Sequence, residues 1–286
     1  MSKFRPVLPQ FLVAASLGLA LTMSTMTSAA DAADLPAAIK ARGTIIAAIV
    51  PNYPPLDVRD PATNQLTGLD VDLGDAIAKR LGVTMQWQET NFEQMMSALA
   101  TGRVDIIMSG MSDLASRHDG ASFVDYMSTG PAFLTRADRI ADFPDMLALC
   151  GKAVGASRRT NFPKDIAAWN DANCVPAGKE SIRYVGTEGS ADARTQLKQG
   201  RIDASVQGNE TIPYIMAQEP NTFAPIGKPI ATQLTGIGFA KADNALRDAV
   251  AGALSQLIAD GTYKQLLTKW SLADNALEKV TIDAGE

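Results

Sequence analysis

Histidine and cysteine are scarce in this chain of 286 residues, which contains one histidine, His118, and two cysteines, Cys150 and Cys174. These three side chains cannot supply the four ligands of an ordinary structural zinc site. The sequence also lacks the zinc-protease pattern HExxH, the phosphate-binding P-loop and the GxSxG motif of serine hydrolases. We therefore expect no metal, no cofactor and none of these three kinds of catalytic site.

Positive charge is in the minority, with 26 Lys and Arg against 31 Asp and Glu and a formal net charge of -5. No basic block or basic-aromatic pattern offsets this balance, so we expect no nucleic-acid partner. The first apolar stretch, Phe11–Leu21, follows Lys3 and Arg5 and precedes small residues that offer cleavage sites after Ala30 or Ala32. It is shorter than a membrane span. Residues 1–32 therefore read as a signal peptide, and we expect a periplasmic mature protein.

Both cysteines lie beyond this signal peptide, at positions 150 and 174. In an oxidising compartment an even pair of cysteines favours a disulfide over two free thiols. Export therefore predicts a bond between Cys150 and Cys174.

The stretch from Leu99 to Arg117 organises the rest of the chain. Its apolar residues predict the end of a helix, a turn at Gly102 and a short buried strand over Val104–Met108. A polar loop and the start of another helix follow, and such a loop presents N–H groups that suit an anion. The guanidinium of Arg117 matches a carboxylate. The predicted contacts of a carboxylate ligand here are Ser109, Gly110, Ser112 and Arg117.

Nearly the same phrase recurs 98 residues later, where LKQGRIDASVQG at 197–208 aligns with LATGRVDIIMSG at 99–110. A helix-turn-strand unit repeated at this distance suits two similar α/β lobes. The alternative is that Gly-Arg-aliphatic-Asp is merely a common helix-to-strand turn. Polar loops at strand ends in two lobes would face a shared cleft, where α/β sheets bind ligands.

Other candidate ligand contacts lie on similar loops. Tyr53 stands in a proline-rich loop at a strand end, Phe92 begins a helix, and Thr160 and Asn161 open a helix in the second half. The two aromatic residues could equally be core or rim residues, and the two polar residues could simply cap their helix.

Seven segments, in this order and spacing, resemble the bacterial extracellular solute-binding proteins of family 3, the polar amino-acid receptors of ABC importers. They are YPPLDV at 53–58, LTGLDVDLGDAIAKRLGV at 66–83, the stretch at 99–117, FVDY at 123–126, GKAVGAS at 151–157, QGRIDA at 199–204 and ADGTYKQLLTKW at 259–270. The interval between Cys150 and Cys174 also resembles a disulfide found in part of that family.

The resemblance implies a two-lobe α/β periplasmic binding protein fold of type II, with two hinge strands and the ligand in the interlobe cleft. Lobe 1 would comprise residues 33–134 and 231–286, and lobe 2 residues 135–230. The protein would be a monomeric binding protein, not an enzyme, that delivers an amino acid or related carboxylate to a permease. Tyr53 and Phe92 would wall the ligand, Gly110 and Ser112 would hydrogen-bond it, Arg117 would hold its carboxylate, and Thr160 and Asn161 would add contacts from lobe 2.

Two departures from the family pattern bear on the ligand. Relatives that bind α-amino acids usually carry an Asp at the position of Gly208 and often an acid at that of Val50, and both acids are missing. Asn209 or Glu210 could replace the first after a small shift of the loop. Together with Arg117, Arg158 or Arg159 would leave two cations facing the cleft, with at most Glu210 opposing them, which favours an anionic ligand.

Two alternatives stay open at this point. If both lobe 2 arginines point into solvent and Glu210 replaces the missing Asp, the protein is a receptor for a neutral amino acid. The same fold also serves periplasmic cyclohexadienyl dehydratases, for which Glu210 is the one candidate acid in the second lobe.

Overall fold

The computed structural model describes residues 1, 2 and 35–286. The chain divides into two units, Met1–Asp31 and Ala32–Glu286, and the helices and strands described below lie in the second. The predicted signal peptide, apart from its first two residues, lies outside the described residues. Among the described residues, no helix combines the length and the apolar character that crossing a membrane requires.

A mixed sheet forms the core of the first lobe, in the order β15-β8-β14-β6-β1-β5, with β7 paired to β14. β1 runs parallel to β5 and β6, while β14 runs antiparallel to β6 and β8. The strands are β1 (Thr44–Ile49), β5 (Thr84–Glu89), β6 (Ile106–Ile107), β7 (Ser112–Asp113), β8 (Ala121–Thr129), β14 (Gln233–Ala240) and β15 (Thr281–Ile282).

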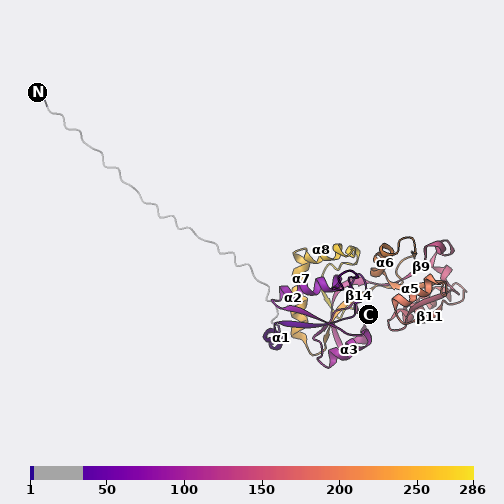
Figure 1. Cartoon of the computed structure of the whole chain (residues 1–286), viewed down its shortest axis with the longest axis horizontal. Helices are drawn as coiled ribbons and strands as arrows, with labels where there is room; N and C mark the ends of the chain where they lie inside the picture. Colours follow the sequence, from indigo (N-terminus) through magenta and orange to yellow (C-terminus); the bar gives the residue numbers. More distant parts are fainter. Residues whose placement is uncertain (3–34) are drawn as a thin grey trace. The chain divides into compact units, whose positions relative to one another are not determined.

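Helices cover both faces of this sheet because β1 is apolar on both sides. Ile45 and Ala47 belong to the core beneath α2, α7 and α8, while Ala48 packs in the core of α3 on the opposite face. Figure 1 shows α2 and α7 on one side of the strands and α3 on the other. The helices of this lobe are α1 (Ala37–Arg42), α2 (Leu69–Arg80), α3 (Phe92–Ala100), α7 (Asn244–Ala259) and α8 (Thr262–Lys269).

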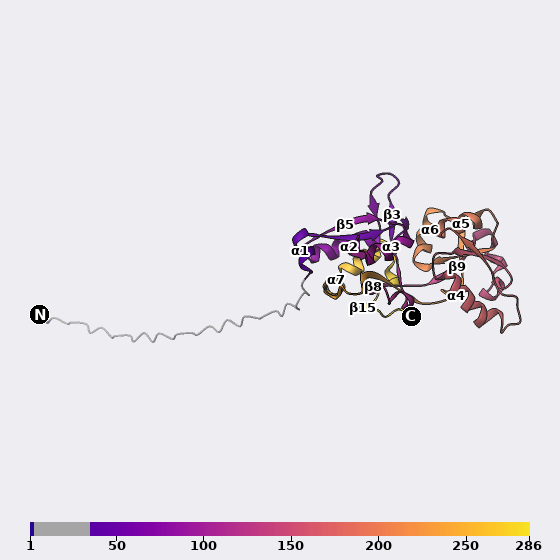
Figure 2. The same cartoon turned by 90° about the horizontal axis from the view of Figure 1, so that it is seen from below.

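The second lobe has a five-stranded sheet in the order β11-β10-β12-β9-β13. Its strands are β9 (Pro131–Arg136), β10 (Ala153–Ser157), β11 (Arg183–Thr187), β12 (Ala204–Gly208) and β13 (Phe223–Ile226). Its helices are α4 (Phe162–Trp169), α5 (Ser190–Lys198) and α6 (Ile212–Gln218). The core of α4 and that of α5 and α6 lie on opposite faces of the sheet. These elements form a group separate from α1, α2 and α3 (Figure 2).

Short elements complete the described part of the chain. A small sheet contains β2 (Asn52–Tyr53), β3 (Asp57–Arg59) and β4 (Leu66–Thr67). The short helical segments are η1 (Ala115–Arg117), η2 (Ala137–Asp142), η3 (Met146–Leu149), η4 (Asn170–Cys174), η5 (Asn209–Thr211) and η6 (Ala273–Asn275).

The repeated sequence phrase has the same structure in both lobes. Gly102 and Gly200 each turn the chain with a φ of 69°, which glycine adopts at low cost. The Asp105 carboxylate then accepts a 2.7 Å hydrogen bond from the N–H of Ile46, the third residue of β1. Asp203 repeats this contact with a 2.9 Å bond from the N–H of Ala153, which begins β10. The aspartates therefore anchor equivalent strands, as expected of two similar lobes.

The chain passes from the first sheet to the second between β8 and β9, and it returns between β13 and β14. The two crossings touch at Gly130, where a Cβ atom would lie 2.1 Å from the carbonyl oxygen of Ala231. Gly130 therefore has to be a glycine for the crossings to lie this close. The lobe limits after residues 134 and 230 stay a prediction.

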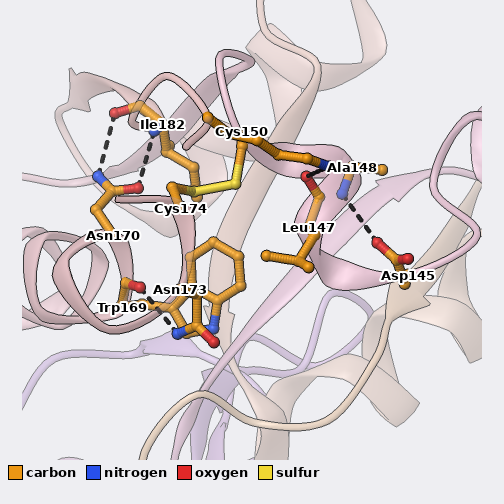
Figure 3. The surroundings of a disulfide bond; sticks show 10 residues. Asp145, Leu147, Ala148, Cys150, Trp169, Asn170, Asn173, Cys174 and Ile182 are labelled. Carbon is orange, nitrogen blue, oxygen red and sulfur yellow. Dashed lines mark hydrogen bonds between the residues drawn. A yellow bond between two sulfur atoms is a disulfide. The ribbon is translucent and has the colours of Figure 1, made fainter. Parts of the chain in front are cut away.

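The predicted disulfide between Cys150 and Cys174 is confirmed, and it joins the end of η3 to the end of η4 with the two Cα atoms 5.7 Å apart. Cys174 is buried in the same apolar cluster as Trp169 (Figure 3). Beside it, the Asn170 side chain accepts a 2.8 Å hydrogen bond from the N–H of Ile182. The bond thus closes the segment that contains β10 and α4.

Candidate functional site

A cavity of about 240 Å³ lies between the two lobes. Its wall is made by the loops after β1, β6, β10, β11 and β12, together with the start of α3 and residues of both crossings. Most of the wall therefore comes from the carboxyl ends of strands, where α/β sheets bind ligands. The charged residues on the wall are Glu93, Arg117, Arg159, Glu188 and Glu210.

The cavity brings together the predicted ligand contacts from both halves of the chain, except Asn209. Those on its wall are Tyr53, Phe92, Ser109, Gly110, Ser112, Arg117, Arg159, Thr160, Asn161 and Glu210. Their contacts with a ligand stay a prediction. Asn209 is not part of the wall, and its Oδ1 atom is buried without a hydrogen-bond partner among the described residues.

Arg117 is held in place by η1, which follows the polar loop. Its guanidinium donates a 2.5 Å hydrogen bond to the carbonyl oxygen of Ser112 and lies 5.9 Å from the centre of the Phe92 ring. Burial lowers the pKa of Arg117, and the charge of Asp113 opposes that effect. No carboxylate of the described residues forms an ion pair with it. Arg117 therefore retains donors for an anionic group.

Glu210 lies on the opposite wall, at the end of β12, with 4% of the residue exposed. Its Oε1 atom accepts a 2.6 Å hydrogen bond from the Tyr53 hydroxyl, while Oε2 is buried without a partner among the described residues. Burial raises the pKa of Glu210 to about 7, although the bond from Tyr53 lowers it. A buried carboxylate with an unused oxygen is suited to receive a cationic group.

The space beside Gly208 explains why Glu210 reaches the cavity. A Cβ atom on residue 208 would lie 2.0 Å from Oε1 of Glu210 and 2.3 Å from the hydroxyl oxygen of Tyr53. The Glu210 carboxyl thus fills the region that a side chain at position 208 would enter. Of the two residues considered as replacements for the missing acid, Glu210 is the one whose carboxyl faces the cavity.

The arginines of the second lobe do not leave unopposed positive charge in the cleft. Arg159 pairs with Glu93 of α3 at 2.6 Å and with Glu188 after β11 at 3.1 Å. Arg158 is not part of the wall and pairs with the other oxygen of Glu188 at 2.8 Å. The expectation that at most Glu210 opposes the cations is therefore wrong, because Glu93 and Glu188 also line the cavity.

A sequence signal for these two acids existed. Glu93 directly follows Phe92, a predicted ligand contact, and Glu188 stands in a loop between a predicted strand and a predicted helix. That position is equivalent to the other loops that form the wall. The ion pair between Glu93 and Arg159 could not be predicted from the sequence, because these residues are 66 positions apart and meet across the cleft.

Two buried carboxyl groups, those of Asp57 and Asp70, accept hydrogen bonds from the polar loop that follows β6. The Ser109 hydroxyl donates a 2.8 Å hydrogen bond to Asp57, and the Gly110 N–H donates a 2.9 Å bond to Asp70. Tyr126 donates a 2.6 Å bond to the other oxygen of Asp70, whose pKa burial raises to about 7. The expectation of free N–H groups is thus wrong for Gly110, because this donor is already used.

A second group of titratable side chains lies behind η1. Ligand-type atoms of Asp113, His118 and Asp283 lie within 4.8 Å of one another, as metal ligands would. The Nε2 atom of His118 lies 2.5 Å from Oδ1 of Asp113, within hydrogen-bond distance, and Asp283 accepts a 2.7 Å hydrogen bond from the N–H of Phe123. Gly285 donates a further 2.7 Å bond to Asp113. These bonds fix the C-terminal segment against β7 and β8.

The family model of the bacterial extracellular solute-binding proteins, family 3, matches residues 45–273. With two similar α/β lobes and a cavity between them, the chain belongs to this family. The arginine-binding protein ArgT of Corynebacterium glutamicum is 25% identical, over 97% of this chain and 97% of the relative. The histidine-binding periplasmic protein of Salmonella typhimurium is 29% identical, over 90% of this chain and 96% of the relative.

Solved structures confirm the two-lobe fold. An ancestral arginine-binding protein bound to glutamine matches 81% of this chain and 99% of its own, with a TM-score of 0.70 and 26% identity. The ancestral amino acid-binding protein AncCDT-1, a precursor of cyclohexadienyl dehydratase, matches 82% and 97% with a TM-score of 0.70 and 28% identity. These relatives are binding proteins for amino acids.

Proposed function

We propose that this protein is an exported, monomeric receptor that binds an α-amino acid between its lobes and delivers it to the permease of an ABC importer. One observation carries the proposal. Of the charged side chains on the cavity wall, Arg117 and Glu210 are the two that form no ion pair within the described residues. They have opposite charges and come from opposite lobes, which suits the carboxylate and the ammonium of one zwitterion.

In this proposal each lobe holds one end of the amino acid backbone. Arg117 binds the carboxylate through its guanidinium fork, and the free oxygen of Glu210 accepts from the ammonium. Phe92 and Tyr53 enclose the ligand, and Thr160 and Asn161 contact it from the second lobe. Because both lobes must approach to satisfy one small ligand, binding stabilises the closed arrangement of residues 33–134 and 231–286 against 135–230.

Relatives and sequence support the remaining parts of the proposal. The family is bacterial and extracellular, and one of the relatives above is named as periplasmic. Removal of residues 1–32 on export gives the two cysteines an oxidising compartment for their disulfide. Delivery to a permease is the role that the resemblance to receptors of ABC importers implies.

A thermal-shift screen of the twenty amino acids, followed by calorimetry, tests the proposal. A ligand at 100 times its dissociation constant should add about 2.7 kcal/mol of stability. Arg117→Ala should then weaken binding by about 30-fold or more, because it leaves the carboxylate buried without its partner. Arg80→Ala, which removes an exposed ion pair with Asp260, is the matched control and should bind normally. Near-native affinity of Arg117→Ala would place the site elsewhere.

A dehydratase remains the second candidate, because Glu210 is a buried acid with a raised pKa of about 7 and AncCDT-1 is a precursor of such an enzyme. Among the described residues of the wall, no second carboxyl group is free to pair with Glu210 in acid-base catalysis, because Glu93 and Glu188 are bound to arginines. We expect no aromatic product on incubation with prephenate or arogenate. Turnover that disappears in Glu210→Gln would establish the enzyme instead.

A further inference from the structure

We infer that the ligand of this cavity is an α-amino acid with an uncharged side chain. The inference rests on the proposed function and specifies it further. It follows from how the five charged side chains of the wall are paired with one another and with Arg158.

Two of the five charges are assigned to the ligand backbone. Arg117 and Glu210 together carry one positive and one negative charge, and they match the carboxylate and the ammonium that every zwitterionic α-amino acid has. They therefore discriminate amino acids from other solutes, but they do not discriminate one side chain from another.

The other three wall charges form a closed network. Arg159 binds Glu93 at 2.6 Å and Glu188 at 3.1 Å, and Glu188 also binds Arg158 at 2.8 Å. Two carboxylates thus face two guanidinium groups, and the network has no net charge. Each acid has at least one arginine partner, and each arginine has an acid partner.

With Arg117 and Glu210 assigned to the ligand backbone, the described residues of the wall leave no unpaired charge for a charged ligand side chain. A basic side chain could reach Glu93 or Glu188 only by competing with an arginine, and an acidic one could reach Arg159 only by competing with both acids. Either charge would lose its hydration on entering the cavity without a compensating ion pair. An uncharged side chain avoids this cost, and the wall offers it polar groups from Ser157, Thr160, Asn161, Ser190 and Gln233.

The exposed fractions of the network make it suitable for substitution. The side chains of Arg159, Glu93 and Glu188 are 47%, 49% and 59% exposed. Single changes to glutamine should therefore alter the charge of the cleft without unfolding the protein.

Calorimetry with glutamine, serine, leucine, lysine, arginine, aspartate and glutamate tests the inference on the intact mature protein. We expect the tightest ligand to be uncharged and the basic and acidic amino acids to bind at least about tenfold more weakly. Tightest binding of a charged amino acid would overturn the inference but leave the proposed function intact. Failure of all twenty amino acids to bind in the thermal-shift screen would overturn the proposed function itself.

Two charge variants then test the network as the cause. Arg159→Gln leaves one unopposed acid, so affinity for lysine or arginine should rise about tenfold relative to an uncharged ligand. Glu93→Gln leaves net positive charge, so affinity for aspartate or glutamate should rise similarly. Arg136→Gln and Glu219→Gln, which change exposed pairs away from the cavity wall, are the controls and should keep the original preference. Unchanged preference in both charge variants would exclude the network as its source.

Discussion

The Tyr53 hydroxyl donates a 2.6 Å hydrogen bond to the Glu210 carboxylate, although the two residues lie 157 positions apart and in different lobes. Tyr53 is in β2 of the first lobe, and Glu210 follows β12 of the second. This bond links the lobes directly and orients the buried carboxyl group of Glu210 on the cavity wall. Tyr53 therefore helps to fix the position of Glu210.

Replacing Tyr53 with Phe should weaken ligand binding while the fold is kept. The change removes the donor to Glu210 and leaves the second carboxyl oxygen of Glu210 buried without a partner. The free energy of unfolding should therefore fall by about 1–3 kcal/mol. Because the bond from Tyr53 lowers the pKa of Glu210, the pKa should rise further in the variant. Binding calorimetry between pH 6 and pH 9 would measure the ligand affinity and, from its pH dependence, the pKa of Glu210. An unchanged affinity and pH profile would show that the bond has no part in binding.

Ligand affinity should depend on pH through Glu210. Its pKa is raised to about 7, so the carboxylate that receives an ammonium is ionised above this pH and protonated below it. Binding should therefore be strongest above pH 7 and should weaken as the pH falls through 7, by up to tenfold per unit. Asp70, which is buried behind the polar loop and whose pKa is also raised to about 7, interacts electrostatically with Glu210 and contributes to the titration. Glu210→Gln separates the two, because only the Asp70 contribution remains in it.

In the ligand-free protein the sign of the pH effect is reversed. A carboxyl whose folded pKa lies above its unfolded value binds protons better in the folded state, so its contribution to stability falls as the pH rises from about 4 to 7. The free energy of unfolding of Glu210→Gln should accordingly increase relative to the wild type over that range. Urea unfolding at pH 5 and pH 8 measures this difference, and a constant difference would contradict the raised pKa.

Gly208→Ala should displace the Glu210 carboxyl and abolish most ligand binding. The new Cβ atom would lie 2.0 Å from Oε1 of Glu210, so the carboxyl must leave its place. Gly252→Ala is the matched control because a Cβ atom at that position in α7 meets nothing within 4 Å. It should bind normally and gain about 0.5–1 kcal/mol of stability. Equal affinities in the two variants would refute the steric argument.

Removing the disulfide by the double substitution Cys150→Ser and Cys174→Ser should lower the free energy of unfolding by roughly 3 kcal/mol in the chain-entropy model. The cysteines lie 24 residues apart and outside the cavity wall, so ligand affinity should be preserved in the folded variant. Urea unfolding and calorimetry measure the two quantities separately. Loss of affinity without loss of stability would show that the bond instead shapes the cavity.

The sequence determined the features that depend on neighbours along the chain. The turns at Gly102 and Gly200 and the strands after them follow from patterns within about ten residues. The repeated aspartates Asp105 and Asp203 could be seen in the sequence, but their hydrogen bonds to Ile46 and Ala153 could not, because these join residues 59 and 50 positions apart. Arg117 could be identified because it follows a polar loop at a strand end. The disulfide could be predicted because export and an even cysteine count do not depend on the fold.

Only the tertiary structure decided which charges are free. Arg159 is neutralised by Glu93 and Glu188, Gly110 donates inward to Asp70, and Glu210 takes the space beside Gly208. Each of these contacts joins segments that meet through packing, across the cleft or across a lobe, and no local periodicity encodes them. An ion pair or a filled space depends on distances of a few ångströms in three dimensions, so residue counting predicted an anionic ligand where the paired charges favour an uncharged side chain.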